Sequence, residues 1–213
     1  MKTENRQTEQ RPGSTSISGV RSNKITLGQL INRQDWITVK GTHICIPSEK
    51  EFVHLQFRRF AGCPVCNMHL QSFARRYDEL TAAGIHEVVV FHSSAKDLLI
   101  SEDKIPFDLI ADPDKRLYVK FGVESSPRAI LNPQAWWPVI RAIVYSLGEI
   151  IRKQSAVPPI NPAGGSFGLP ADFLIDSNGR VIASKYGQHA DDQWSVDELL
   201  AKVNAKQRTL LPA

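Results

Sequence analysis

The pair Cys63 and Cys66 lies where a strand-like run gives way to a helix-like run, and this junction constrains the fold more than any other feature. Before it, residues 51–60 carry apolar side chains at near-alternating positions, which is the period of a β-strand. After it, apolar residues recur at three- and four-residue steps, which predicts a helix over residues 65–83. The chain therefore presents two cysteines at the start of a helix that follows a strand.

The local sequence favours a reactive thiol at Cys63. Gly62 allows a sharp turn, and Pro64 suits the first helical position because its missing N–H would be unpaired there. Cys63 is then the helix N-cap, where unpaired N–H groups and the helix dipole favour a thiolate, and such cysteines commonly have pKa values of about 3.5–7.5. Cys66 follows one turn later, close enough to form a disulfide with Cys63. Position predicts Cys63 as the nucleophile and the better shielded Cys66 as the resolving thiol.

Other readings of the cysteines stay open. The pair could be structural, or it could bind copper or zinc together with His69, with His43 and Cys45 as further ligands. Cys45 lies in an apolar strand-like run, which favours a small core residue. A non-catalytic interaction module that keeps the fold is the third alternative.

Composition favours one globular domain with a small appendage. The 213 residues are 42% hydrophobic and 23% charged, and the net charge is +4. The sequence has no basic run with interleaved aromatic residues, so we expect no nucleic-acid partner. We also expect no membrane span, because no apolar run is long enough. Three cysteines and a polar start without a secretory signal make the cytoplasm the expected compartment.

Three segments are expected outside the core of the domain. Residues 1–23 are polar and predict a disordered or extended arm, residues 24–205 form the domain, and residues 206–213 form a tail. Residues 125–162 are treated as an insertion with an amphipathic helix over residues 137–153. Its apolar stripe either covers the domain's own core or leaves Trp136 and Trp137 exposed as a lid or docking face.

The predicted elements alternate between strand and helix and close with a hairpin. This order predicts an α/β, thioredoxin-like fold with a central mixed sheet flanked by helices and a helical insertion before the last β-hairpin. Further strands are predicted over residues 36–46 (with a break at Gly41), 85–91, 107–111, 171–175 and 181–186, and further helices up to residue 99 and over residues 114–121 and 194–203.

Three segments resemble the thioredoxin superfamily and, within it, the peroxiredoxin-like AhpC/TSA antioxidant family. Residues 57–66 are similar to the active-site segment, residues 120–123 to the Tyr/Phe-Gly-Val after the third helix, and residues 164–176 to the entry of the late hairpin. The resemblance covers roughly residues 36–203.

The resemblance implies a thiol peroxidase that reduces hydroperoxides by a Cys63/Cys66 dithiol–disulfide cycle, or alternatively a protein disulfide oxidoreductase. A thioredoxin- or glutathione-type reductant would complete the cycle, no cofactor or metal is implied, and a homodimer is allowed. The superfamily also places a cis-proline against the cysteines, so we expect a cis Leu169–Pro170 bond with Pro170 beside Cys63.

The sequence departs from the family pattern at two positions. Phe60 stands where peroxiredoxins carry Thr or Ser, and residues 168–171 lack the expected Arg. Alternation along the strand puts one of Arg58 and Arg59 on the cysteine side, and Arg59 is the candidate catalytic residue.

Overall fold

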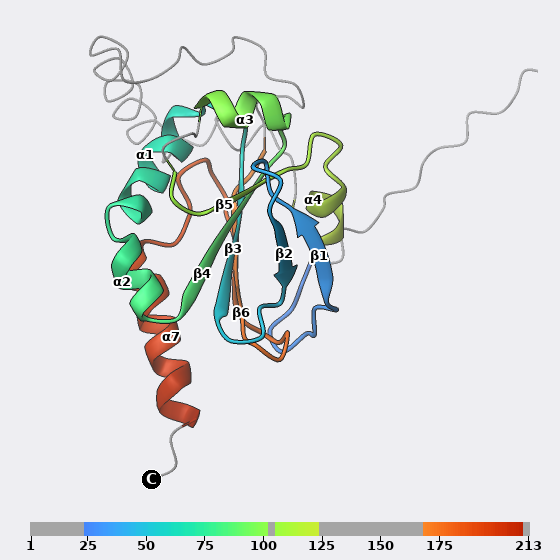
Figure 1. Cartoon of the computed structure of the whole chain (residues 1–213). Coiled ribbons are helices and arrows are strands. Elements are labelled where there is room, and N and C mark those ends of the chain that lie inside the picture. The colour runs from blue at the N-terminus through green and yellow to red at the C-terminus, as the bar shows by residue number, and fades with distance from the viewer. Residues whose placement is uncertain (1–23, 102–104, 124–167, 211–213) are drawn as a thin grey trace, which may run out of the picture.

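The structure, a computed structural model, describes residues 24–101, 105–123 and 168–210 (Figure 1). The expected N-terminal arm and the insertion with its helix over residues 137–153 lie outside the described residues.

A five-stranded mixed sheet forms the centre of the fold, in the order β5-β4-β3-β6-β7 (Figure 1). Parallel pairing joins β3 to β4 and β4 to β5, whereas β6 runs antiparallel to both β3 and β7. This arrangement confirms the predicted thioredoxin-like fold. The strands are β3 (Phe52–Arg58), β4 (Ile85–Phe91), β5 (Asp108–Ala111), β6 (Ala171–Ile175) and β7 (Val181–Tyr186).

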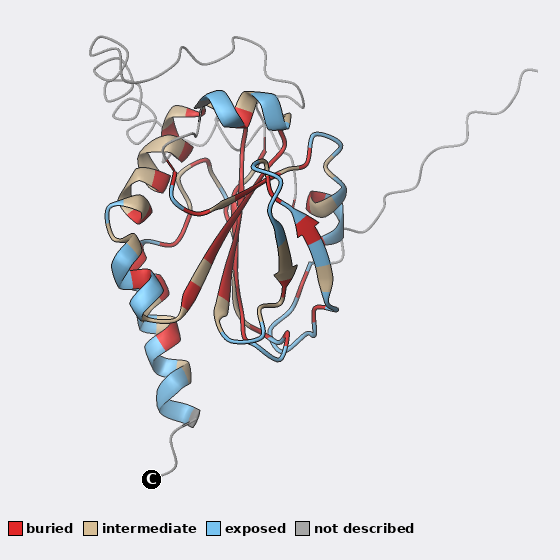
Figure 2. Cartoon of the chain, viewed as in Figure 1, coloured by how far each residue is buried: buried red, intermediate tan, exposed pale blue. Residues whose placement is uncertain are grey.

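Helices and a separate β-ribbon cover the two faces of the sheet (Figure 1). One face packs against α1 (Pro64–Ala74), α2 (Tyr77–Ala82), α3 (Ala95–Ser101) and α7 (Val196–Leu210). The other face packs against α4 (Arg116–Lys120) and the antiparallel pair β1 (Gln34–Ile37) and β2 (His43–Ile46). Figure 2 shows the central strands buried along most of their length, as expected for a sheet covered on both sides.

The helix after the cysteines and the last helix differ from the prediction. The helix expected over residues 65–83 is interrupted at Arg75 and Arg76, where Arg76 leaves helical geometry and its guanidinium binds both Glu79 and Asp197 of α7. The last helix spans Val196–Leu210 instead of ending at Val203. Its final turns have partners of their own, because the side-chain amide of Gln207 donates to the carbonyl of Ala83 at 3.4 Å.

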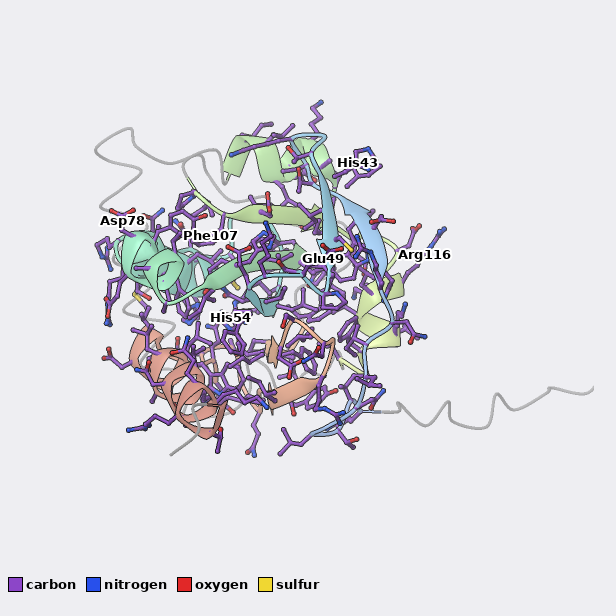
Figure 3. All side chains as sticks on the ribbon, turned by 60° about the horizontal axis from the view of Figure 1, so that its bottom comes forward. His43, Glu49, His54, Asp78, Phe107 and Arg116 are labelled. Atoms are coloured by element: carbon purple, nitrogen blue, oxygen red, sulfur yellow. The ribbon has the colours of Figure 1, made fainter. Side chains whose placement is uncertain are left out.

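A row of polar side chains is fully buried on the helix-covered face of β3. Side chains alternate along a strand, so Val53, Leu55 and Phe57 face the β-ribbon and α4. The residues between and after them, His54, Gln56 and Arg58, face α1 and α7. All three polar side chains are 0% exposed. The ring of His54, which is labelled in Figure 3, stacks with the rings of Phe73 of α1 and Trp194 before α7, with ring centroids 5.5 Å and 5.7 Å away.

Carboxylates from the neighbouring strands pair with this row. Asp172 of β6 accepts a hydrogen bond from Arg58 Nη2 at 2.6 Å and lies 3.3 Å from His54 Nε2. Glu87 of β4 lies 2.8 Å from His54 Nδ1 and accepts from Gln56 Nε2 at 2.5 Å. Burial lowers the pKa of His54, but the two carboxylates outweigh that effect and raise it to about 9. The row thus buries two cationic and two acidic groups in contact with one another.

We predict that Asp172→Asn destabilises the fold strongly, because the buried Arg58 and His54 then lose a compensating charge. Breaking such a buried pair costs about 3–5 kcal/mol of the free energy of unfolding, which urea denaturation measures. Asp197→Asn is the matched control, because it breaks an exposed pair with Arg76 and should change stability little. Equal losses in the two variants would show that the buried row does not hold the sheet together.

Candidate active site

Cys63 is the N-cap of α1, and Pro64 occupies the first helical position, as the sequence predicts. The turn before it contains Gly62 at φ +76°, a conformation that glycine adopts without strain. The carbonyl of Cys63 accepts the N–H of Asn67 at 2.8 Å, which begins the helical hydrogen-bond ladder. Cys63 and Cys66 are both free thiols and both 1% exposed. The expectation that Cys66 is better shielded is therefore wrong, and any difference between the thiols must come from their partners.

The surroundings of the two thiols shift their pKa values in opposite directions. A hydrogen bond from the Cys66 thiol lowers the pKa of Cys63 most, burial opposes it, and the charge of Arg59 with the N–H groups of Cys66 and Val65 brings the pKa to about 6. Burial and the neighbouring Cys63 raise the pKa of Cys66 well above its ordinary value. At neutral pH the pair therefore holds one thiolate, at Cys63, and one thiol, at Cys66.

Arg59, and not Arg58, faces the cysteines. Arg58 is the last residue of β3 and points into the buried polar row. Arg59 Nη1 lies 3.8 Å from Cys63 Sγ, and its guanidinium lies over the ring of Phe60 at 5.4 Å from the ring centroid. The position where the family pattern has a hydroxyl is thus an aromatic surface that supports the arginine.

Two residues beyond the end of β4, which sequence reasoning assigned no part in the site, contact the loop before Cys63. Ser93 Oγ accepts the N–H of Ala61 at 2.9 Å, and the N–H of His92 donates to the carbonyl of Arg59 at 3.3 Å. The neighbouring Ser94 caps α3 through the N–H of Asp97. Local sequence patterns could not predict the contact of Ser93, because its partner Ala61 lies 32 positions away.

The expected cis form of the Leu169–Pro170 bond is wrong, and the position of Pro170 beside Cys63 stays a prediction. The Leu169–Pro170 peptide is trans, and among the described residues the cis bond is Ile46–Pro47. Pro170 is buried, and its carbonyl accepts the N–H of Gly187 at 2.8 Å. A Cβ on Gly187 would lie 2.7 Å from the Pro170 ring, so the proline packs against the end of β7. Because β6 begins at Ala171, the missing N–H of Pro170 falls outside the strand and is tolerated there without a special conformation.

The residues considered as metal ligands are not gathered around the thiols. His69 Nε2 lies 2.8 Å from the carbonyl of Trp194, and its ring packs on Phe73. His43 and Cys45 belong to β2, in the separate two-stranded sheet. Across residues 24–101, 105–123 and 168–210, no group of three or more His, Cys, Asp or Glu side chains is placed to hold a metal ion. Nor does that part of the chain contain a helix with the length and apolar character needed to cross a membrane.

The chain matches the protein family described as AhpC/TSA antioxidant enzyme over residues 72–189. The matched residues begin after Cys66, so the family match and the thiol geometry rest on different parts of the chain. None of the curated proteins compared with the chain matches it.

Several solved peroxiredoxin structures share the fold at low sequence identity. The reduced 2-Cys peroxiredoxin of Plasmodium vivax has a TM-score of 0.61 and 16% identity, over 86% of this chain and 83% of that one. A cysteine-to-serine mutant of Peroxiredoxin 6 from Arenicola marina has a TM-score of 0.62 and 16% identity, over 87% and 75% of the two chains. Mycobacterium tuberculosis AhpC has a TM-score of 0.56 and 15% identity, over 89% and 97%.

We predict that alkylation of Cys63 follows a titration with a midpoint near pH 6. A lowered pKa keeps the thiolate present at neutral pH, so the rate should fall as pH falls through about 6. Cys66→Ala should raise the midpoint most, because it removes the hydrogen bond to Cys63, and Arg59→Met should raise it less. Cys66→Ser keeps a donor and serves as the control. Site-resolved mass spectrometry measures the rates, and faster labelling of Cys66 than of Cys63 would reverse the assignment.

Proposed function

We propose that this protein, which belongs to the AhpC/TSA antioxidant enzyme family, reduces hydroperoxides through a dithiol–disulfide cycle of Cys63 and Cys66. The observation that carries the proposal is the asymmetry of the thiols, with the pKa of Cys63 lowered to about 6 and that of Cys66 raised. A peroxidatic cysteine needs a thiolate, and a resolving cysteine needs to remain nearby without competing for the oxidant.

The first step is attack of the Cys63 thiolate on an oxygen of the hydroperoxide. The O–O bond breaks, the attacked OH oxygen stays on the sulfur with its proton as a sulfenic acid, and the other oxygen leaves as an anion that takes one proton from solvent to give an alcohol or water. Arg59, 3.8 Å from the sulfur, supports the thiolate and lies close enough to favour negative charge on the leaving oxygen. Phe60 supplies no hydroxyl at this site, so the peroxide oxygens are stabilised by Arg59 and the N–H groups at the start of α1.

The second step forms the disulfide. Cys66 loses its proton, attacks the sulfur of Cys63 and displaces the sulfenic oxygen, which leaves as water. Since Cys66 follows one turn after Cys63 on α1, the bond can form between neighbouring side chains. A thioredoxin- or glutathione-type reductant then supplies two electrons and two protons to restore both thiols. We propose the cytoplasm as the compartment, because the cycle needs a reducing pool.

The second candidate function is reduction of protein disulfides. Phe60 in place of a hydroxyl residue favours it, because a departing thiolate needs less stabilisation than a departing oxygen anion. In that reaction Cys63 attacks a substrate disulfide, a thiolate leaves, and Cys66 resolves the mixed disulfide. Both candidate functions therefore use the same two cysteines and differ in their substrate.

We predict consumption of hydrogen peroxide and of an organic hydroperoxide, measured beside reduction of insulin disulfides with the same thiol reductant. Cys63→Ser should abolish peroxide consumption because the nucleophile is lost. Cys66→Ser should still form a sulfenic acid on Cys63, but its turnover should require the external thiol to attack that sulfenic acid directly, since no resolving cysteine remains.

Cys45→Ser is the matched control, because Cys45 lies on β2 in the other sheet, and it should behave as wild type. Insulin reduction without peroxide consumption would replace the first candidate with the second. Peroxide consumption that persists in Cys63→Ser would contradict both.

A further inference from the structure

The loop from Arg59 to Gly62 is held by residues that lie beyond the end of β4. The ladder between β3 and β4 ends with the pair Arg58 and Phe91. The segments that follow the two strands remain in contact past that point. The N–H of His92 donates to the carbonyl of Arg59 at 3.3 Å. Ser93 then presents its hydroxyl oxygen, not a carbonyl, to the N–H of Ala61 at 2.9 Å. A side chain thus replaces the strand ladder where the chain turns toward the cysteines.

The contact between Ser93 and Ala61 is shielded from water. Ser93 is 3% exposed and Ala61 is 1% exposed. A buried N–H that loses its acceptor is destabilised by about 1–3 kcal/mol, so the loop would move to find another partner. The hydrogen bond therefore specifies one position of the loop.

Gly168 lies beside His92, the residue whose N–H binds the carbonyl of Arg59. A Cβ at this position would lie 2.9 Å from His92 Nε2 and 3.8 Å from the Cα of Arg59. Gly168 therefore leaves no room for a side chain beside the His92 ring, which an added Cβ would force to move, whereas the Cα of Arg59 would be at ordinary contact distance. Arg59 is held at its carbonyl by the N–H of His92.

The position of this backbone determines how Arg59 meets Cys63. Arg59 Nη1 lies 3.8 Å from Cys63 Sγ, which is near the outer limit of a direct contact. The groups that lower the pKa of Cys63 are Cys66 and the N–H of Val65 on its own helix, and Arg59 on the loop. Because a charge interaction weakens with distance, a shift of the loop by about 1 Å is enough to change the support that Arg59 provides.

We propose that Ser93 is a positioning residue of the thiol reaction, whose hydroxyl holds residues 59–62 where Arg59 reaches Cys63. The inference rests on the proposed function in taking Cys63 as the nucleophile. Ser93 touches neither the substrate nor the sulfur, and it acts through the backbone of the loop. A role confined to stability would lower the melting temperature without changing the ionisation of Cys63.

The test compares Ser93→Ala with Ser94→Ala in the reduced, full-length protein. Ser94 is a matched control, because its hydroxyl also accepts a backbone N–H, that of Asp97, but at the start of α3. Ser93→Ala should raise the pKa of Cys63 and slow its alkylation severalfold at about pH 5.5, where the thiolate fraction limits the rate. Ser94→Ala should leave the pKa unchanged, and Ser93→Thr, which keeps the hydroxyl, should restore the wild-type value.

A second variant keeps the test decisive if Ser93→Ala does not fold. Ser93→Val has nearly the shape of Ser93→Thr but no hydroxyl, and it should also raise the pKa of Cys63, because the N–H of Ala61 loses the same acceptor. An unchanged pKa in the folded variants overturns the proposal, whatever their melting temperatures. Peroxide consumption is measured separately, so its absence in wild type would contradict the proposed function while the pKa values still decide the role of Ser93.

Discussion

The contact between the Arg59 guanidinium and Cys63 Sγ depends on a constraint set one residue earlier. Arg58 points into the buried row and pairs with Asp172, whereas Arg59, the first residue after β3, reaches the thiol at 3.8 Å. A slip of β3 by one residue would exchange the two arginines and place every polar side chain of the row on the apolar face. The buried pair between Arg58 and Asp172 therefore fixes which arginine serves the cysteine.

The same buried row links the sheet to the helix that carries the thiols. Asp172 accepts the N–H of Trp194 at 3.2 Å, and the carbonyl of Trp194 lies 2.8 Å from His69 Nε2 on α1. His54 packs against Phe73 of the same helix. Buried charges are unfavourable unless they are paired, and here the pairing requires β3, β4 and β6 to be in register. The arrangement that satisfies these charges is also the one that sets α1 above the end of β3.

Local patterns predicted much of this structure, and contacts between distant residues account for what they missed. The run over residues 85–91 is β4 without a shift in either boundary, because a continuous apolar run suits a strand buried on both faces. The helix start at Cys63 follows from its immediate neighbours. The pairing of Arg58 with Asp172 spans 114 positions, so alternation could show that one arginine faces the thiol without showing which. The cis form expected at Pro170 came from a resemblance, and the local backbone does not adopt it.

The central claim is that Cys63 receives the oxygen and Cys66 removes it. The most direct measurement is peptide mass mapping after one equivalent of hydrogen peroxide is added to the reduced protein, with free thiols alkylated at once. The account predicts a Cys63–Cys66 disulfide in wild type, with Cys45 still alkylated, and a sulfenic acid trapped by dimedone on Cys63 in Cys66→Ser. Dimedone on Cys66 in a Cys63→Ser variant at the same rate, or a disulfide that includes Cys45, would contradict it.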